Sequence, residues 1–508
     1  MTKNIEQKEL ELFNDSCEPN RPNRLCVSLS DIHLTDGTVG LQNLSIEEWN
    51  SFYTGLSALC NEKNIKEVSF ILDGDVVDML RSSRWAENNI YPWERERIED
   101  FSRIVNKIIH DIVDKEHVEF FTWLKELKCN LVRDTNINDI KDVNIVVILG
   151  NHDKELLCDQ EALSYFYKEG LGKSLDNFSD AERAWIGRMY GDEKMFADKQ
   201  TAPFFPFYYA DRGFRFFTTH GQWRDDTNSR KIYAKSGLPG WTAKDGWQNE
   251  VWQQLNFSPF IEPCFGDTIA AGVLSTFIYK TKSKLEKNKR LTTILSELDL
   301  YRPTYKALTR IIDETKSMRS KDDCDHDAIR IIEEAMYICI VQWLSWNFTH
   351  ESSSTWKSIV FRALKFILKI AKLVNLEMKV IYYFIKTMIK IDPSDYDVKL
   401  KEMKKFPAFM DVYKDYGFQI HGEGHTHHPL EEEPNIRKGR PTTYINFGTW
   451  RDQILGRKNT GYRRRSVLRA FYILDLKNKE VCKSEDDRSF KYYTSDIIKW
   501  SNKADSLT

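Results

Sequence analysis

The sequence predicts an α/β protein interrupted by a large all-α insertion, and two patterns lead to this prediction. Five short apolar runs, rich in Val, Ile and Phe, each end abruptly in a cluster of Asp, His, Asn or Gly. Such runs are typical of buried strands whose carboxyl ends carry polar side chains. Between the fourth and fifth runs, residues 297–315 and 327–346 instead have apolar side chains at helical spacing, and Pro is scarce.

The expected strands cover residues 25–30, 68–72, 144–149, 214–219 and 418–420, and a closing strand at 444–450 is followed by an antiparallel partner at 466–476. The polar clusters after the first five strands are Asp31-Ile32-His33, Gly74-Asp75-Val76-Val77-Asp78, Gly150-Asn151-His152-Asp153, His220-Gly221 and Gly424-His425-Thr426-His427. Open α/β sheets bind ligands at the carboxyl edge of their strands. We therefore expect five distant segments to deliver these side chains to one crevice.

The chain is expected to divide into five segments. They are a flexible N-terminus at 1–21, the two parts of an α/β domain at 22–235 and 405–485, a helical insertion at 236–404 and a C-terminal tail at 486–508. Both ends of the insertion leave from the edge that carries the polar clusters. We therefore expect the insertion to form a cap beside or over that edge.

The composition excludes a strong overall electrostatic field. The 508 residues include 74 Lys and Arg against 76 Asp and Glu, so an anionic partner has to be met by local patches. Residues 1–20 lack an apolar core, and no uncharged apolar run is expected to be long enough to span a bilayer, which favours the cytoplasm. Nine cysteines are scattered singly, as expected for reduced thiols.

Taken in order, the patterns D-x-H, G-D-x-x-D, G-N-H-D, H and G-H-x-H resemble those of the calcineurin-like metallophosphoesterase superfamily. The resemblance covers about residues 22–230 and 410–480 and leaves out the insertion. It implies a four-layer α/β/β/α sandwich. It also implies a dinuclear-metal phosphohydrolase that cleaves a phosphomonoester or a phosphodiester by attack of a metal-bridging hydroxide.

The resemblance also implies roles for individual residues. One metal ion would be held by Asp31, His33 and His427, the other by Asn151, His220 and His425, and Asp75 would bridge the two. His152 would face the substrate and support the leaving oxygen. Candidates for a supporting or substrate-contacting role are Asp78, Asp153, Arg84, Arg224 and Arg451. Imidazole ligands without thiolates favour Mn²⁺, with Fe, Zn²⁺ and Co²⁺ as alternatives.

Three other functions stay open at this point. One is a nuclease of the repair-exonuclease type. The basic hairpin tip at 456–465 is compatible with a nucleic-acid partner. Another is a lipid-linked pyrophosphate hydrolase. His220-Gly221 followed by two acids is similar to the branch that cleaves UDP-diacylglucosamine, although that branch usually has Arg in place of His152. A non-enzymatic scaffold is disfavoured, because every ligand position is filled.

The segment 358–391 combines an apolar helix with a narrow basic stripe. The stripe consists of Arg362, Lys365, Lys369, Lys372, Lys379, Lys386 and Lys390. We expect the helix to be buried in the cap with its stripe in water, so that charges placed at Phe366 or Ile370 would destabilise the protein. A homo-oligomer formed through the insertion and a helix on a membrane surface are the alternatives, and membrane contact is not favoured.

Overall fold

The computed structural model describes residues 9–14, 18–41, 44–134, 140, 142–225, 227–229, 256–302, 305–319, 325–353, 355–374, 376, 378–384, 400–434, 441–457 and 461–500. Several sequence-based predictions lie outside these residues. They concern Asp226, the hairpin tip at 458–460, and Lys386 and Lys390 of the basic stripe.

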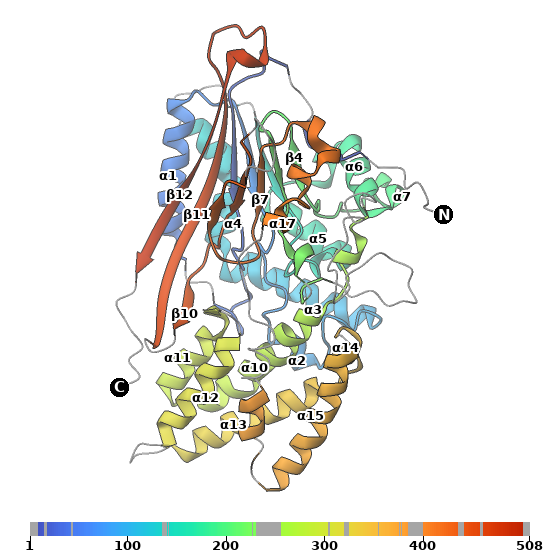
Figure 1. Ribbon diagram of the computed structural model, residues 1–508, viewed down its shortest axis with the longest axis vertical. Coiled ribbons are helices and arrows are strands. Elements are labelled where there is room, and N and C mark those ends of the chain that lie inside the picture. The colour runs from blue at the N-terminus through green and yellow to red at the C-terminus, as the bar shows by residue number, and fades with distance from the viewer. Residues whose placement is uncertain are drawn as a thin grey trace.

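Within these described residues the strands form two sheets (Figure 1), and the larger sheet has seven strands. Its order is β3 (Asp142–Val147), β2 (Glu67–Leu72), β1 (Arg24–Leu29), β11 (Gly461–Lys477), β10 (Gln453–Arg457) and β6 (Tyr301–Arg302), with β12 (Arg488–Trp500) paired along β11. The strands β1, β2 and β3 are parallel, and Leu29 lies opposite Leu72, which in turn lies opposite Val147. The three strands therefore end together at one edge.

The second sheet contains five strands. Its order is β4 (Tyr209–Asp211), β5 (Phe216–Thr218), β7 (Ile420–Glu423), β9 (Thr443–Asn446) and β8 (Leu430–Glu432). Here β5, β7 and β9 are parallel, and Thr218 lies opposite Gly422, which lies opposite Ile445. The polar segments after β5 and β7 therefore also leave from a common edge.

The two sheets share a buried apolar core. Cys26 and Ile71 of the larger sheet pack in one cluster with Phe216, Ile420 and Ile445 of the smaller sheet. Alternate residues of β1, such as Val27, belong instead to the cluster that contains Trp49 of α1 (Ile46–Glu62) and Leu124 of α4 (Val118–Asp134). This alternation is the period of two expected for a strand covered on both faces. The predicted α/β class is therefore confirmed.

Further helices precede the insertion in the chain. They are α2 (Arg84–Asn88), α3 (Ile98–Asp111), α5 (Gln160–Tyr165), α6 (Asp180–Tyr190) and α7 (Glu193–Ala197).

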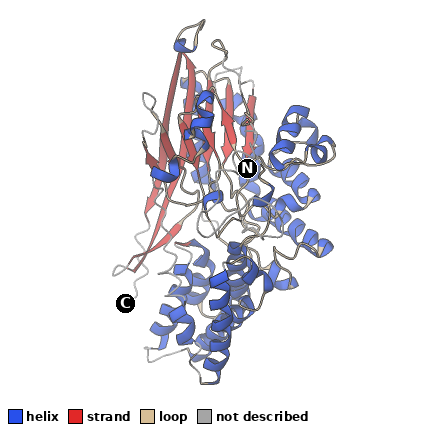
Figure 2. Cartoon of the chain, turned by 45° about the vertical axis from the view of Figure 1, so that its right-hand side comes forward, coloured by secondary structure: helices blue, strands red, loops and turns tan. Residues whose placement is uncertain are grey.

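The insertion forms a helical unit beyond one end of the sheets (Figures 1 and 2). Among the described residues this unit contains α9 (Phe265–Asp267), α10 (Thr276–Lys282), α11 (Lys289–Glu297), α12 (Tyr305–Arg319), α13 (His326–Trp343), α14 (Asn347–Glu351) and α15 (Thr355–Leu373). The helix α17 (Leu400–Met403) is not part of it, because its Met403 lies in the cluster that contains Val27 of β1. Most of the buried side chains of the unit form a cluster of their own. The expectation of an all-α insertion is wrong at Tyr301 and Arg302, which form β6 and pair with β10. Two residues are too few to show a strand period in the sequence.

The expectation of a C-terminal tail at 486–508 is wrong for most of that segment. Strand β12 runs antiparallel to β11 from Arg488, opposite Lys477, to Trp500, opposite Arg465. Phe490 packs against the core between the sheets. Most of β12 is exposed or half-buried, so its sequence lacks the apolar alternation that marks a strand with one buried face.

One stretch of the described residues is apolar over a long distance, although charged residues such as Asp267 and Lys280 interrupt it. The stretch Ser258–Leu285 is long and apolar enough, by length and composition, to cross a bilayer. However, 72% of its most apolar window is buried inside the protein. It includes α9 and α10, and its Phe277 and Ile278 lie in the core of the insertion. Its apolar character is therefore that of a core helix of the insertion.

Candidate metal centre

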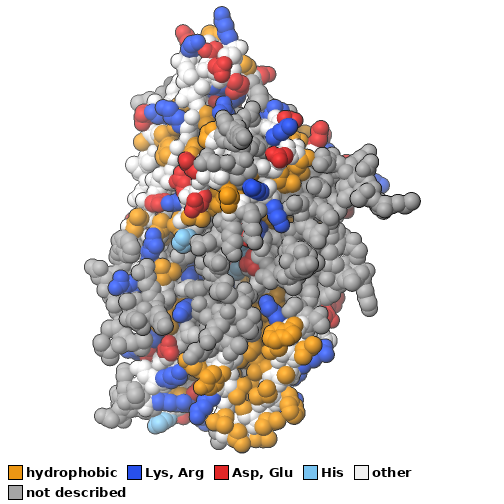
Figure 3. All heavy atoms as spheres, viewed as in Figure 1, with side chains coloured by type: hydrophobic (Ala, Val, Ile, Leu, Met, Phe, Trp, Pro, Cys, Tyr) orange, Lys and Arg blue, Asp and Glu red, His pale blue; other side chains and the backbone are white. Residues whose placement is uncertain are grey.

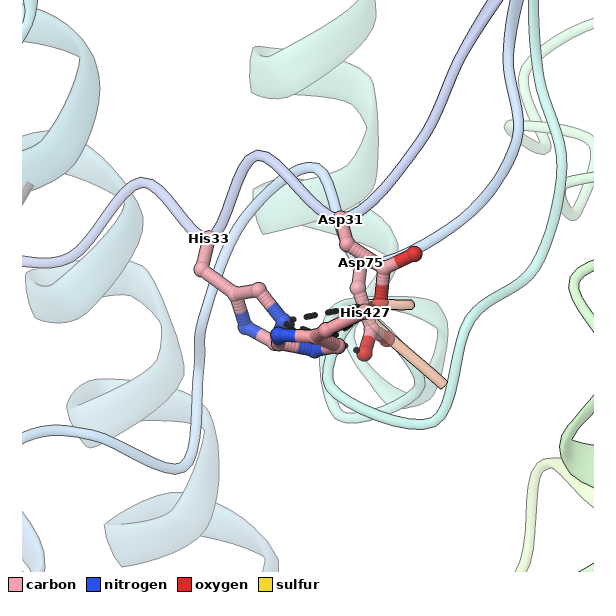
Figure 4. A group of neighbouring side chains, drawn as sticks. All are labelled: Asp31, His33, Asp75 and His427. Carbon is pink, nitrogen blue, oxygen red and sulfur yellow. Dashed lines mark hydrogen bonds and ion pairs between the residues drawn. The ribbon is translucent and has the colours of Figure 1, made fainter. Parts of the chain in front are cut away.

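The polar segments after five strands meet at the common edge of the two sheets. Asp31, His33, Asp75 and His427 form a buried group whose ligand atoms all lie within 4.8 Å of one another (Figure 4). His427 Nε2 lies 3.1 Å from Asp31 Oδ1, and His33 Nε2 lies 3.6 Å from Asp75 Oδ2. The side chains that Figure 4 labels point toward one another from the ends of β1, β2 and β7.

A second group contains Asp75, His220 and His425, again with ligand atoms within 4.8 Å of one another. His220 Nε2 lies 3.3 Å from Asp75 Oδ2. Asp75 therefore belongs to both groups, as the predicted bridging carboxylate should. His425 Nε2 also contacts Asp225 Oδ2 at 2.9 Å. Although burial opposes ionisation, this hydrogen bond lowers the pKa of Asp225 to about 2.

Asn151 is held close to Asp75 because the residue that follows it, His152, contacts the Asp75 carboxylate. The amide of His152 donates to Asp75 Oδ1 at 2.8 Å, and the Asn151 amide nitrogen lies 3.5 Å from Asn228 Oδ1. The Asn151 side-chain oxygen is buried and has no hydrogen-bond partner among the described residues. Asn151 therefore brings an unsatisfied oxygen to the neighbourhood of the shared carboxylate.

Two further predicted ligands also carry an unsatisfied buried atom. Asp31 Oδ1 and His220 Nε2 make no well-aligned hydrogen bond within the described part of the chain, although His427 Nε2 and Asp75 Oδ2 lie 3.1 Å and 3.3 Å away, respectively. A buried polar atom without a partner is costly, and a bound cation would satisfy it. Carboxylate and amide oxygens together with imidazole nitrogens are the donors that Mn²⁺, Fe, Zn²⁺ and Co²⁺ accept. These residues therefore fit a divalent-metal centre.

Hydrogen bonds on the outer side of the rings orient the histidines. His220 Nδ1 lies 2.7 Å from the carbonyl oxygen of Asp73, which can only accept, so Nδ1 carries a proton and Nε2 faces Asp75. Burial lowers the pKa of His220, but the carboxylates of Asp75 and Asp31 outweigh it and raise the pKa to about 10. A metal ion would therefore displace a proton from this ring.

Asp78 connects two histidines. Its Oδ2 lies 3.0 Å from His33 Nδ1, and its Oδ1 lies 2.7 Å from His152 Nδ1. Burial opposes ionisation, yet the two imidazoles hold the pKa of Asp78 well below its usual range. In the same way, burial lowers the pKa of His152, but Asp78 and Asp75 raise it to about 9. Because Asp78 contacts Nδ1 of both rings, Nε2 of His33 and Nε2 of His152 point away from Asp78.

The backbone at this edge is strained. Five residues without a glycine's freedom have a left-handed φ, namely Asp31 (54°), His33 (53°), Asp75 (51°), His425 (66°) and His427 (57°). Such conformations are rare outside glycine, cost free energy and cluster at functional sites.

Two glycines, Gly74 and Gly424, allow their backbone to lie against neighbouring side chains of this edge. A Cβ at Gly74 would overlap the His220 ring, and one at Gly424 would overlap Ser30 Oγ.

The other predicted residues lie around this centre. Asp153 accepts backbone hydrogen bonds from Asp75 at 2.7 Å and Val77 at 2.9 Å, and so holds the loop after β2. Burial, with the Asp75 charge, raises the pKa of Asp153 to about 8. The three predicted arginines form ion pairs with other carboxylates and not with the predicted metal ligands. The pairs are Arg84 with Asp111, Arg224 with Glu423 and Arg451 with Asp299.

Sequence reasoning missed one arginine of the insertion. Arg302 lies on β6, and its Nε and Nη2 are 3.4 Å and 3.3 Å from His427 Nδ1. Burial and the Arg302 charge lower the pKa of His427 to about 3, so this ring is neutral at pH 7. Arg302 stands in no motif, and only the pairing of β6 with β10 brings it here.

No protein-family model, no curated protein and no solved structure matches this chain.

Proposed function

We propose that this protein is a dinuclear-metal phosphohydrolase that cleaves a phosphomonoester or a phosphodiester. The observation that carries the proposal is the position of Asp75, whose carboxylate belongs to both buried His and Asp groups. Two cations close together need such a shared anion, since their repulsion is otherwise uncompensated. The proposal includes the four-layer sandwich of the calcineurin-like metallophosphoesterases, for which the packing of the two sheets provides support.

In this proposal the chain holds the metal ions through seven side chains. Asp31, His33 and His427 take one ion, Asn151, His220 and His425 take the other, and Asp75 contacts both. When bound, two divalent cations would draw charge from the phosphate oxygens and acidify a water molecule. Mn²⁺ is the first choice for this donor set, and Fe, Zn²⁺ and Co²⁺ are the alternatives.

His152 is the proposed proton donor to the leaving oxygen. Asp78 holds its Nδ1 at 2.7 Å, so the opposite ring nitrogen is free to face a substrate. The His152 side chain keeps 14% exposure, whereas that of Asp78 keeps 1%. The pKa of about 9 keeps the ring protonated at pH 7. A protonated imidazole that is accessible and fixed in orientation is suited to general-acid catalysis.

The test combines metal analysis with turnover. Purified protein loaded with Mn²⁺ is assayed on p-nitrophenyl phosphate and bis-p-nitrophenyl phosphate, and bound metal is counted by plasma mass spectrometry. The proposal expects hydrolysis of at least one ester, and Asp75→Asn should lose both hydrolysis and metal. Asp111→Asn is the matched control, since Asp111 is also a buried aspartate but binds Arg84 outside the centre. The Asp111→Asn variant should keep both its hydrolytic activity and its bound metal.

Two results would contradict the proposal. Folded wild-type protein that binds two metal ions and hydrolyses neither ester, nor nucleotides or DNA, would support a scaffold instead. Full turnover and full metal content in Asp75→Asn would remove the bridging role of Asp75.

A further inference from the structure

Helix α15 in the insertion presents three parallel stripes of side chains. The inner stripe consists of Phe361, Leu364, Leu368 and Ala371. All four are buried, and the first three belong to the core of the insertion. The next stripe is basic and consists of Arg362, Lys365, Lys369 and Lys372. The third is apolar and consists of Ile359, Ala363, Phe366, Ile370 and Leu373. All three follow the three- and four-residue steps of a helix, so each runs along one side.

The third stripe is exposed, which contradicts the expectation that this helix is buried in the cap with only its basic stripe in water. Phe366 is 66% exposed, Ile370 49% and Leu373 83%. Half of the exposed large apolar side chains of the described residues lie between positions 356 and 383, at Trp356, Ile359, Phe366, Ile367, Ile370, Leu373, Val374, Leu376 and Tyr383. Figure 3 shows hydrophobic side chains gathered at the end of the molecule where α15 lies. Soluble monomers rarely leave so many apolar side chains together in water.

The charges of α15 distinguish between two kinds of occupant. The helix carries five basic side chains and no acidic one. No ion pair joins Arg362, Lys365 or Lys369 to a carboxylate in the described parts of the chain. A second copy packed symmetrically on this face would bring two basic stripes together without compensation. A bilayer with anionic headgroups would instead receive the apolar side chains in its interface and neutralise the basic stripe.

We propose that α15 is a membrane-docking helix, whose stripe from Ile359 to Leu373 enters the interface of an anionic bilayer while the neighbouring basic stripe binds lipid phosphates. Trp356 and Tyr383 add exposed aromatic rings of the kind that favour this interface. The inference does not depend on the phosphohydrolase proposal, since none of these residues belongs to the metal centre.

The test measures sedimentation of the full-length protein with vesicles of phosphatidylcholine and phosphatidylserine. Binding should be strong at low salt, fall as NaCl is added and be weak on phosphatidylcholine alone. Phe366→Asp combined with Leu373→Asp should abolish it. Reversal of Lys365, Lys369 and Lys372 to Glu should weaken it by about 100-fold or more.

Matched controls separate docking from damage to the fold. Ile98→Asp makes the same change at a side chain that is 71% exposed but lies on α3, outside the insertion, and it should bind like the wild type. Because Phe366 and Leu373 are exposed, their variants should unfold at the wild-type temperature. If they fail to fold, vesicles of phosphatidylserine and brominated phosphatidylcholine provide a second measurement on intact protein, since they should quench wild-type fluorescence more than that of Trp356→Phe.

Three results would overturn the proposal. The first is wild-type protein that does not sediment with anionic vesicles at low salt. The second is unchanged binding by the Phe366 and Leu373 double variant. The third is a salt-resistant dimer in light scattering that this variant dissociates, without vesicle binding, which would assign the face to a second copy.

Discussion

The Nε2 atoms of His33 and His427 face each other at 3.0 Å, although the two residues follow strands of different sheets. Asp78 accepts from His33 Nδ1, so in neutral His33 the lone pair lies on Nε2. Asp31 Oδ1 lies 3.1 Å from the same atom of His427. Imidazole nitrogens and carboxylate oxygens directed at one point provide the donors that a divalent transition-metal ion requires.

Divalent metal should therefore stabilise the folded protein. Mn²⁺ added to protein stripped with EDTA is expected to raise the midpoint of thermal unfolding in scanning calorimetry. At a metal concentration of a hundred times the dissociation constant, the gain in unfolding free energy is about 2.7 kcal/mol. Ca²⁺, which prefers oxygen ligands alone, should have a smaller effect. An unchanged midpoint with Mn²⁺, Zn²⁺, Co²⁺ and Fe²⁺ would contradict a metal centre here.

His152→Ala should separate proton donation from metal binding. The variant is expected to keep its metal content and to lose roughly 10²- to 10⁴-fold in kcat, the usual contribution of a positioned acid. The loss should be smaller for p-nitrophenyl esters than for alkyl esters, because a good leaving group needs less protonation. Equal losses on both esters would argue against His152 as the donor and leave only electrostatic support of the substrate.

Gly424→Ala should damage the centre through sterics. Its new methyl group would overlap Ser30 Oγ and approach Asp31, so either the backbone before His425 or Asp31 must move. We expect lost metal binding and a stability loss of more than about 2 kcal/mol in urea unfolding. Gly55→Ala is the matched control. Nothing lies near its Cβ position in α1, and the same change there should stabilise the helix by about 0.5–1 kcal/mol.

His117 should make the stability of the protein depend on pH. Burial lowers its pKa to about 4, and its Nε2 lies 2.9 Å from the carbonyl oxygen of Thr35. In the unfolded chain the pKa is about 6.5, so the unfolded state binds the proton first as pH falls. Above a pH of about 6.5 neutral His117 does not reduce the free energy of unfolding, and as pH falls toward 4 about 3 kcal/mol of that free energy is lost. His117→Gln keeps a donor for Thr35 and should flatten this part of the curve of unfolding free energy against pH; an unchanged slope would contradict it.

The sequence contained enough information to locate the candidate metal centre because its residues follow a local rule. Asp31 and Asp75 each stand directly after a buried apolar strand, and parallel strands bring such positions to one edge. The left-handed backbone at these residues could not be predicted, since Asp and His adopt it more often than most residues but still only rarely. Asp78 was expected to support the site, but its contact with both His33 and His152 depends on side-chain geometry.

The insertion was harder to predict because its placement depends on contacts distant in sequence. Arg302 reaches His427 through a two-residue strand that no periodicity indicates. For α15, the sequence predicted an amphipathic helix with a basic stripe but not which apolar side faces the core. Phe361 and Phe366 are equally apolar, and only packing makes one buried and the other exposed.

The pairing of β1 has a consequence for how the protein is made. Ser28 lies beside Ile71 on one side and beside Phe471 on the other, so the first strand of the sheet gains its second neighbour from near the end of the described chain. On the ribosome, Asp31 and His33 are therefore synthesised long before His425 and His427. Chains released early, within the insertion, should bind no pair of metal ions and should leave the edge of β1 open to chaperones or to aggregation.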